Sequence, residues 1–150
     1  MLSGDVFGGY ATAEWTPNKS FYGTGESFVF SFGSPGLDAD PSFPAEGSVC
    51  AYPWTTENDF FQWSDESQIS MGGGGDGFAF LLSRDFNDGT SGSCATFGNQ
   101  PLASLNVKNN ANGPFCIRNI EVWSFSKPRS PSKNVRSPRS GSKNISGYKR

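Results

Sequence analysis

The sequence of 150 residues contains no histidine and only three cysteines, and each scarcity removes a class of site. Without histidine, the side chain that most often serves as general acid, general base or metal ligand is missing. Cys50, Cys94 and Cys116 are widely spaced and form no C-x-x-C pair, so we expect no metal site and no disulfide framework. We predict buried or half-buried thiols in a reducing compartment, with Cys94 the most accessible because polar residues and glycine flank it.

Long hydrophobic runs are also missing from the chain. No stretch is long enough for a transmembrane segment, and residues 1–5 lack the basic start and apolar core of a signal peptide. We therefore expect a cytoplasmic protein. The basic residues near the C-terminus would also suit nuclear import.

Charged and aromatic residues divide the chain near residue 125. Residues 1–125 hold all 14 acidic residues and four basic ones, a net charge of −10, together with all 14 Phe and all 4 Trp. Residues 126–150 carry eight basic residues, no acidic one and few apolar ones, so we expect a disordered, Ser/Pro-rich tail of charge +8. Ser130 and Ser137 each precede proline and are phosphorylation candidates, where a phosphate adds about −1.5 to −2 charge.

Short apolar segments separated by glycine and proline predict an all-β protein. Alternation is clearest in residues 27–32, where Phe28, Phe30 and Phe32 share one face and Ser27, Val29 and Ser31 the other. Further strands are expected at residues 5–15, 49–54, 60–63, 78–82 and 115–125, the last with a bulge near residues 118–119. Loops are expected at residues 16–26, 33–48, 89–99 and 106–114. No amphipathic helix is evident, and the pattern favours a two-sheet antiparallel β-sandwich.

Four consecutive glycines, Gly72–Gly75, mark an unusual backbone path. With Gly77 they match the G-x-G-x-x-G spacing of nucleotide-binding loops, but that motif opens a helix, whereas a strand-like segment follows here. We favour a turn or bulge whose side chains are absent because another layer packs against it. Residues 84–89 similarly lack the spacing and the final glutamate of a calcium loop, and they predict an Asx-type turn.

Candidates for catalysis are few. Without histidine, acid–base chemistry would depend on carboxylates such as Glu26 and Glu121, which nothing in the sequence pairs. Glu26 lies between a glycine-rich loop and a strand, a position from which it would also accept backbone hydrogen bonds. A hydrolase-like enzyme using Glu26 or Glu121 is one alternative for the function. A protein that associates with nucleic acid through its basic tail is another.

Six stretches, in order between residues 5 and 125, carry a resemblance to a known family. They are DVFGG (5–9), FYGTGESFVF (21–30), NDFF (58–61), ISMGGGG (69–75), SCATFGN (93–99) and IEVWSF (120–125). In them the chain resembles the TLDc domain family, which includes the oxidation resistance proteins and a nuclear receptor coactivator branch. The motif residues are Tyr22, Gly23, Thr24, Gly25, Glu26, Gly72, Gly73, Gly74, Gly75, Cys94, Thr96, Phe97, Gly98, Asn99, Glu121 and Trp123.

The resemblance implies a TLDc-like β-sandwich with a few short helices over residues 1–125, followed by the tail at 126–150. It also implies a non-catalytic interaction domain that protects against oxidative damage and binds the vacuolar proton ATPase, without a cofactor. We do not expect nucleic acid as the main partner. Family domains have several tens of residues before the strand that starts this chain, so we expect an N-terminally truncated domain whose exposed apolar surface promotes self-association.

Overall fold

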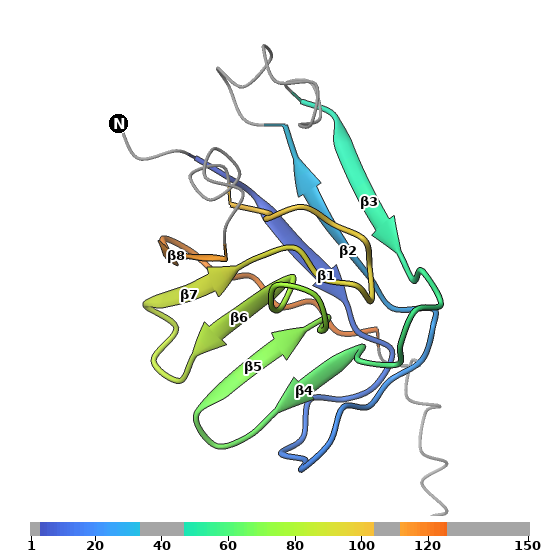
Figure 1. Ribbon diagram of the computed structural model, residues 1–150. Coiled ribbons are helices and arrows are strands. Elements are labelled where there is room, and N and C mark those ends of the chain that lie inside the picture. Colours follow the sequence, from blue (N-terminus) through green and yellow to red (C-terminus); the bar gives the residue numbers. More distant parts are fainter. Residues whose placement is uncertain (1–3, 34–46, 104–111, 126–150) are drawn as a thin grey trace, which may run out of the picture. The chain divides into compact units, whose positions relative to one another are not determined.

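The computed structural model describes residues 4–33, 47–103 and 112–125, and in these segments it contains eight strands and no helix (Figure 1). The strands are β1 (Phe7–Tyr10), β2 (Phe28–Phe32), β3 (Val49–Pro53), β4 (Gln62–Ser64), β5 (Gln68–Met71), β6 (Phe80–Ser83), β7 (Asp88–Ser91) and β8 (Gly113–Cys116). No helix long and apolar enough to cross a membrane occurs in the described segments. Contacts divide the chain into two units, Met1–Ile120, which contains all these strands, and Glu121–Arg150.

The eight strands form two antiparallel sheets. One has the order β1-β2-β3, and the other has the order β4-β5-β6-β7-β8, in which each strand pairs with the next along the chain. This arrangement confirms the predicted all-β, two-sheet fold. The short helices that the resemblance implies do not occur in the described residues.

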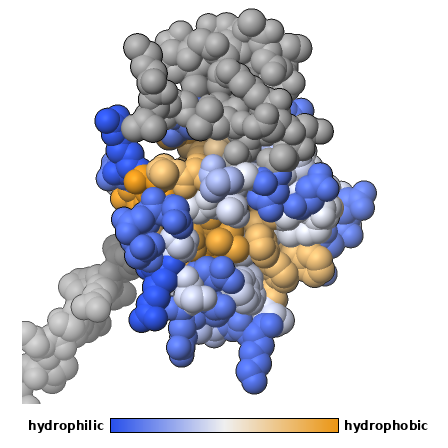
Figure 2. Space-filling view, turned by 60° about the vertical axis from the view of Figure 1, so that its left-hand side comes forward, coloured by the Kyte–Doolittle hydropathy of each residue, from blue (hydrophilic) through white to orange (hydrophobic). Residues whose placement is uncertain are grey.

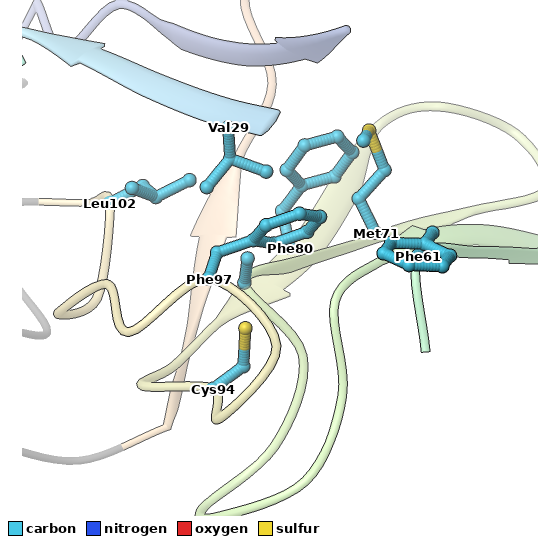
Figure 3. Packing of buried hydrophobic residues seen from close by; sticks show 8 residues of the cluster. Val29, Phe61, Met71, Phe80, Cys94, Phe97 and Leu102 are labelled. Atoms are coloured by element: carbon cyan, nitrogen blue, oxygen red, sulfur yellow. The ribbon is translucent and has the colours of Figure 1, made fainter. Parts of the chain in front are cut away.

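The core lies where inward-facing residues of the two sheets meet (Figure 3). Val29 of β2 is fully buried in one cluster with Met71 of β5 and Phe80 of β6. Phe7 of β1 packs against Phe80, with ring centroids 6.2 Å apart, and meets Phe115 of β8 edge-on at 5.1 Å. Burial of these large apolar side chains from both sheets stabilises the sandwich.

Strand β2 has its serine face inside and its phenylalanine face outside. Ser27, Val29 and Ser31 are at most 3% exposed, whereas Phe28 and Phe30 are half-buried and Phe32 is 39% exposed. The alternation predicted from the sequence is confirmed, and the structure assigns the smaller side chains to the core. Val29 packs there in one cluster with Met71 and Phe80 of the opposite sheet.

Other predictions were less accurate. Residues 5–15 form a shorter strand, because the chain leaves the sheet after Tyr10. The loop predicted at residues 89–99 was wrong in its first part, since Asp88–Ser91 is β7, and β5 was not predicted at all. The strand predicted at 115–125 was also wrong beyond Cys116, because residues 117–125 form no ladder, and residue 118 lies in a bend.

Several predictions fall wholly or mostly outside the described residues. They are the loop at 33–48, the loop at 106–114, the disordered tail at 126–150, and the phosphorylation candidates Ser130 and Ser137. The loop prediction was wrong for residues 113 and 114, which are described and begin β8.

Candidate functional site

Most of the family-motif residues assemble around the buried side chain of Thr96. We call this group, which comprises Asn58, Gly72–Gly75 and Cys94–Asn99, the Thr96 network. Its glycines follow β5 and its Cys94–Asn99 segment is a tight turn closed by a bridge between Cys94 and Asn99. Figure 3 shows Cys94 and Phe97 of this turn beside the core residues.

The glycine run lies directly against the Cys94–Asn99 turn. Gly72 has φ +73°, a backbone conformation that is strained for residues with a side chain. A Cβ at this position would also lie 2.5 Å from the Cys94 sulfur. A Cβ on Gly73 would lie 3.0 Å from Phe60, and one on Gly74 would lie 3.0 Å from the Asn58 amide nitrogen. The predicted turn with another layer packed against it is therefore confirmed, and a strand, β6, follows it.

The Thr96 hydroxyl joins three segments of the chain. It accepts a hydrogen bond from the Gly73 N–H at 3.0 Å and lies 2.7 Å from the Asn58 Oδ1, to which it donates. The Thr96 N–H donates to the Gly73 carbonyl at 3.2 Å, and the Thr96 carbonyl accepts from the Thr55 N–H at 2.9 Å. Thr96 is fully buried, so these hydrogen bonds are shielded from competition with water.

Cys94 and Asn99 are also fully engaged inside the protein. The Asn99 side chain donates to the carbonyls of Gly92 and Gln100 at 3.0 and 2.8 Å and accepts from the Cys94 thiol at 3.0 Å. Burial raises the pKa of the Cys94 thiol above its ordinary value. The prediction that Cys94 is the most accessible thiol was wrong, because the glycine run covers it. Cys116 is the exposed thiol, so the prediction of buried or half-buried thiols also fails for that residue.

The Tyr22–Glu26 motif forms a second group, which ties the β1–β2 connection to β4. The Tyr22 backbone pairs with Gln62, and its hydroxyl lies 3.0 Å from the Thr16 carbonyl and 2.8 Å from the Ser64 hydroxyl. The Thr24 N–H donates to the Thr12 hydroxyl at 2.9 Å. Gly23 and Gly25 leave room for Gln62 and for the Trp54 ring. These motif residues therefore fix the path of a long loop.

The two candidate catalytic carboxylates lie in different units of the chain. Glu26 is exposed on the first unit, and Glu121 is exposed in the second. Trp123, beside Glu121, is 80% exposed. Over the described residues, no three cysteine or acidic side chains lie close enough to hold a metal ion.

The sequence interpretation did not identify Thr55, which bonds to the Thr96 network, and it included Asn58 only as part of the NDFF stretch. Asn58 accepts from the Phe60 N–H at 3.0 Å as well as from Thr96, and the Thr55 hydroxyl donates to the Ala95 carbonyl at 2.7 Å. The sequence could have indicated Asn58, because asparagine often accepts a hydrogen bond from the N–H two residues later in an Asx turn. No local pattern marks Thr55, whose partner is 40 residues away.

The predicted Asx-type turn between β6 and β7 is confirmed. The Asp85 carboxylate accepts from the Ser83 hydroxyl at 2.8 Å and from the Asn87 N–H at 3.3 Å. These hydrogen bonds hold the pKa of the Asp85 carboxyl below its ordinary value. The carboxylate is thus used to close the hairpin.

Comparison with known proteins identifies relatives of the chain. The chain is 38% identical to oxidation resistance protein 1 of Bos taurus over 120 residues, which is 80% of this chain and 12% of that protein. It is 38% identical to oxidation resistance protein 1 of Homo sapiens over 122 residues, 81% of this chain and 12% of that protein. It is 32% identical to nuclear receptor coactivator 7 of Mus musculus over 124 residues, 83% of this chain and 11% of that protein.

The chain spans about an eighth of the length of these relatives. The family description "TLDc domain" matches residues 2–126, which include both motif groups. The chain belongs to the TLDc domain family.

Proposed function

We propose that this chain is a non-catalytic TLDc interaction domain that acts in protection against oxidative damage, with the vacuolar proton ATPase as its protein partner. The observation that carries the proposal is the use of the motif residues inside the fold. Thr96, Asn99 and Tyr22 each bind backbone or side-chain groups of other segments. In this chain these residues hold loops in fixed positions, and an interaction domain needs a surface of fixed shape.

The position of Cys94 argues against direct reaction of this motif thiol with an oxidant. Oxidants react with the thiolate, and a buried thiol with a raised pKa holds little of it at neutral pH. The names of the relatives point to oxidation resistance. A domain that protects through a bound partner accommodates both observations.

A survival assay tests the protective role. Cells that lack their own oxidation resistance protein would express the chain, and their survival after hydrogen peroxide would be compared with an empty-vector control. We expect protection by the native chain and by Glu121→Gln, because the proposed protection does not depend on catalysis by this carboxylate. Loss of protection in Glu121→Gln, with normal protein level, would favour the hydrolase alternative.

The partner is tested separately by co-purification. The tagged chain would be mixed with purified vacuolar proton ATPase, and bound subunits would be identified after washing at physiological salt. We expect recovery of the ATPase with the native chain and not with Thr96→Val, which disturbs the shape of the domain. Protection without recovery of the ATPase would retain the protective role and reject this partner.

A further inference from the structure

The outer face of the three-stranded sheet carries no charged residue and, apart from the Tyr10 hydroxyl, no polar side-chain group. Phe7, Gly9, Val29 and Ser31 face inward, so the alternate positions of the same strands face outward. Pairing continues one residue beyond β1, because the Phe32 N–H donates to the Val6 carbonyl at 2.8 Å. The outward positions are Val6, Gly8, Tyr10, Phe28, Phe30, Phe32, Val49, Ala51 and Pro53. We call these nine residues the outer apolar face.

Aromatic rings run along the centre of the outer apolar face. Tyr10 stacks on Phe28 with ring centroids 5.4 Å apart, and Phe30 lies between Phe28 at 6.4 Å and Phe32 at 5.9 Å. The Phe30 ring lies over Gly8, where a Cβ would come within 2.9 Å of it. These contacts fix the rings in place, so the face is a preformed surface.

Much of this face is accessible to solvent. Tyr10 and Phe32 are each 39% exposed, Val49 is 55% exposed and Val6 is 56% exposed. On the side of the molecule shown in Figure 2, hydrophobic residues likewise reach the surface between hydrophilic ones. An antiparallel sheet with one solvent-facing side normally alternates apolar and polar residues, and a face whose single polar side-chain group is a tyrosine hydroxyl is typical of a covered surface.

The dimensions of the face suit one helix. Five-residue strands extend about 16 Å, and the outer two strand axes of a three-stranded sheet are about 10 Å apart. A helix of about 11 residues is about 16 Å long and about 10 Å wide. A stable dimer buries about 800 Å² of accessible surface on each partner, whereas this face, about 16 Å long and about 15 Å wide across three strands, has a planar area of only about 240 Å². The area therefore favours a single helix over a second copy of the chain.

Acidic residues at the ends of the face indicate which charge should flank the apolar stripe of such a helix. Asp5 precedes Val6 at one end of the sheet, and Glu26 lies two residues before Phe28 at the other. The described part of the first unit carries ten acidic and three basic residues. Lysine or arginine beside the apolar stripe of the helix would complement this charge.

We propose that the outer apolar face binds one amphipathic α-helix of a protein partner, whose apolar stripe is flanked by lysine or arginine. The inference rests on the proposed role as an interaction domain, and it adds where the partner binds and the chemistry of the segment that is bound. It uses the helix-on-sheet packing that closes ordinary domains.

The test uses the full 150-residue chain and a fluorescent 14-residue peptide of leucine and lysine with leucines at i, i+3, i+4 and i+7. Binding is measured by anisotropy, and its location by amide chemical shifts. The disrupting variant is Phe32→Thr with Val49→Thr, which keeps strand propensity while making the face polar. The control variant is Phe86→Asn, which removes a 46% exposed phenylalanine from the β6–β7 turn at φ 55°, where asparagine is tolerated.

We expect the native chain and the Phe86→Asn control to bind the peptide equally, with shifts confined to β1–β3. The double variant should bind at least about tenfold more weakly while melting as cooperatively as the native chain. A peptide with glutamate for lysine should produce no shifts in β1–β3. Equal binding by a folded double variant, or equal shifts with the glutamate peptide, would overturn the proposal.

Sedimentation without peptide tests whether a second copy of the chain, rather than a helix, occupies the outer apolar face. A concentration-dependent dimer that disappears in the double variant would assign the outer apolar face to a second copy of the chain and overturn the proposal, whereas a monomer supports it. The peroxide assay separates this inference from the proposed function. Protection by the native chain without peptide binding would reject the inference alone, and peptide binding without protection would reject the protective role alone.

Discussion

Replacing Thr96 by valine should destabilise the protein strongly, although the two side chains have nearly the same shape. The hydroxyl is fully buried and forms hydrogen bonds with the Gly73 N–H at 3.0 Å and the Asn58 carboxamide at 2.7 Å. Valine removes both bonds and leaves the buried Gly73 N–H without a partner. A lost hydrogen bond costs about 1 kcal/mol, and a buried unsatisfied donor costs about 1–3 kcal/mol.

We therefore expect the free energy of unfolding to fall by about 3 kcal/mol in Thr96→Val, and Tm to fall by about 10 °C. The matched variant Thr96→Ser keeps the hydroxyl and loses one methyl group, which should cost about 1 kcal/mol. Urea unfolding followed by tryptophan fluorescence measures both, and an unchanged m value confirms that only stability has changed.

The ranking of the two variants decides the outcome. If Thr96→Val is as stable as the native chain, or more stable than Thr96→Ser, the hydroxyl is not what holds the three segments together. Packing of the methyl group would then be the main contribution of Thr96.

Three further predictions follow from the same geometry. Gly72→Ala should lower the free energy of unfolding in urea by about 3 kcal/mol or more, because the residue has φ +73° and its new Cβ would lie 2.5 Å from the Cys94 sulfur. The control Gly47→Ala, where φ is +76° but the space around the residue is open, should cost only about 1–2 kcal/mol. Equal costs for the two variants would contradict the packing argument. Ser70→Ala should leave Tm unchanged or raise it, because the buried Ser70 hydroxyl has no hydrogen-bond partner among the described residues; a fall of several degrees would show that a partner exists. In the native chain, alkylation should modify Cys116 first and Cys94 last. Early alkylation of Cys94 at neutral pH would refute its burial. Because the pKa of Cys94 is raised, the folded state keeps the thiol proton to a higher pH than the unfolded state. The free energy of unfolding should therefore decrease as the pH rises above the pKa of the unfolded state, and it should not increase further below that pKa.

The sequence predicted those parts of the fold whose residues carry a local pattern. Strand β2 alternates Phe with smaller residues, and its bounds were close to those observed. Strand β7 is Asp-Gly-Thr-Ser, with a single β-branched residue and no apolar alternation. It is a strand because Gly89 leaves space for the Phe115 ring and the Ser91 hydroxyl bonds the Ala79 carbonyl at 2.7 Å, and both partners are distant in sequence.

The burial of Cys94 could not be predicted for the same reason. Its neighbours Ser93 and Ala95 resemble those of an exposed loop. The Gly72–Gly75 run covers the thiol, and only the three-dimensional fold brings that run to the turn. The family motifs did point to the residues of both motif groups, but not to Thr55, because its contribution depends on a hydrogen bond to a carbonyl 40 residues away.

The Thr96 network also affects how fast the protein folds and unfolds. Its hydrogen bonds join residues separated by 23 and 38 positions, so two chain loops must close before the hydroxyl meets its partners. Closing such loops costs entropy, and contacts of this range tend to form late. Interactions absent from the folding transition state slow unfolding without speeding folding. We therefore expect the Thr96 network to prolong the lifetime of the folded domain and, with it, the time for which the buried Cys94 thiol is kept away from solvent.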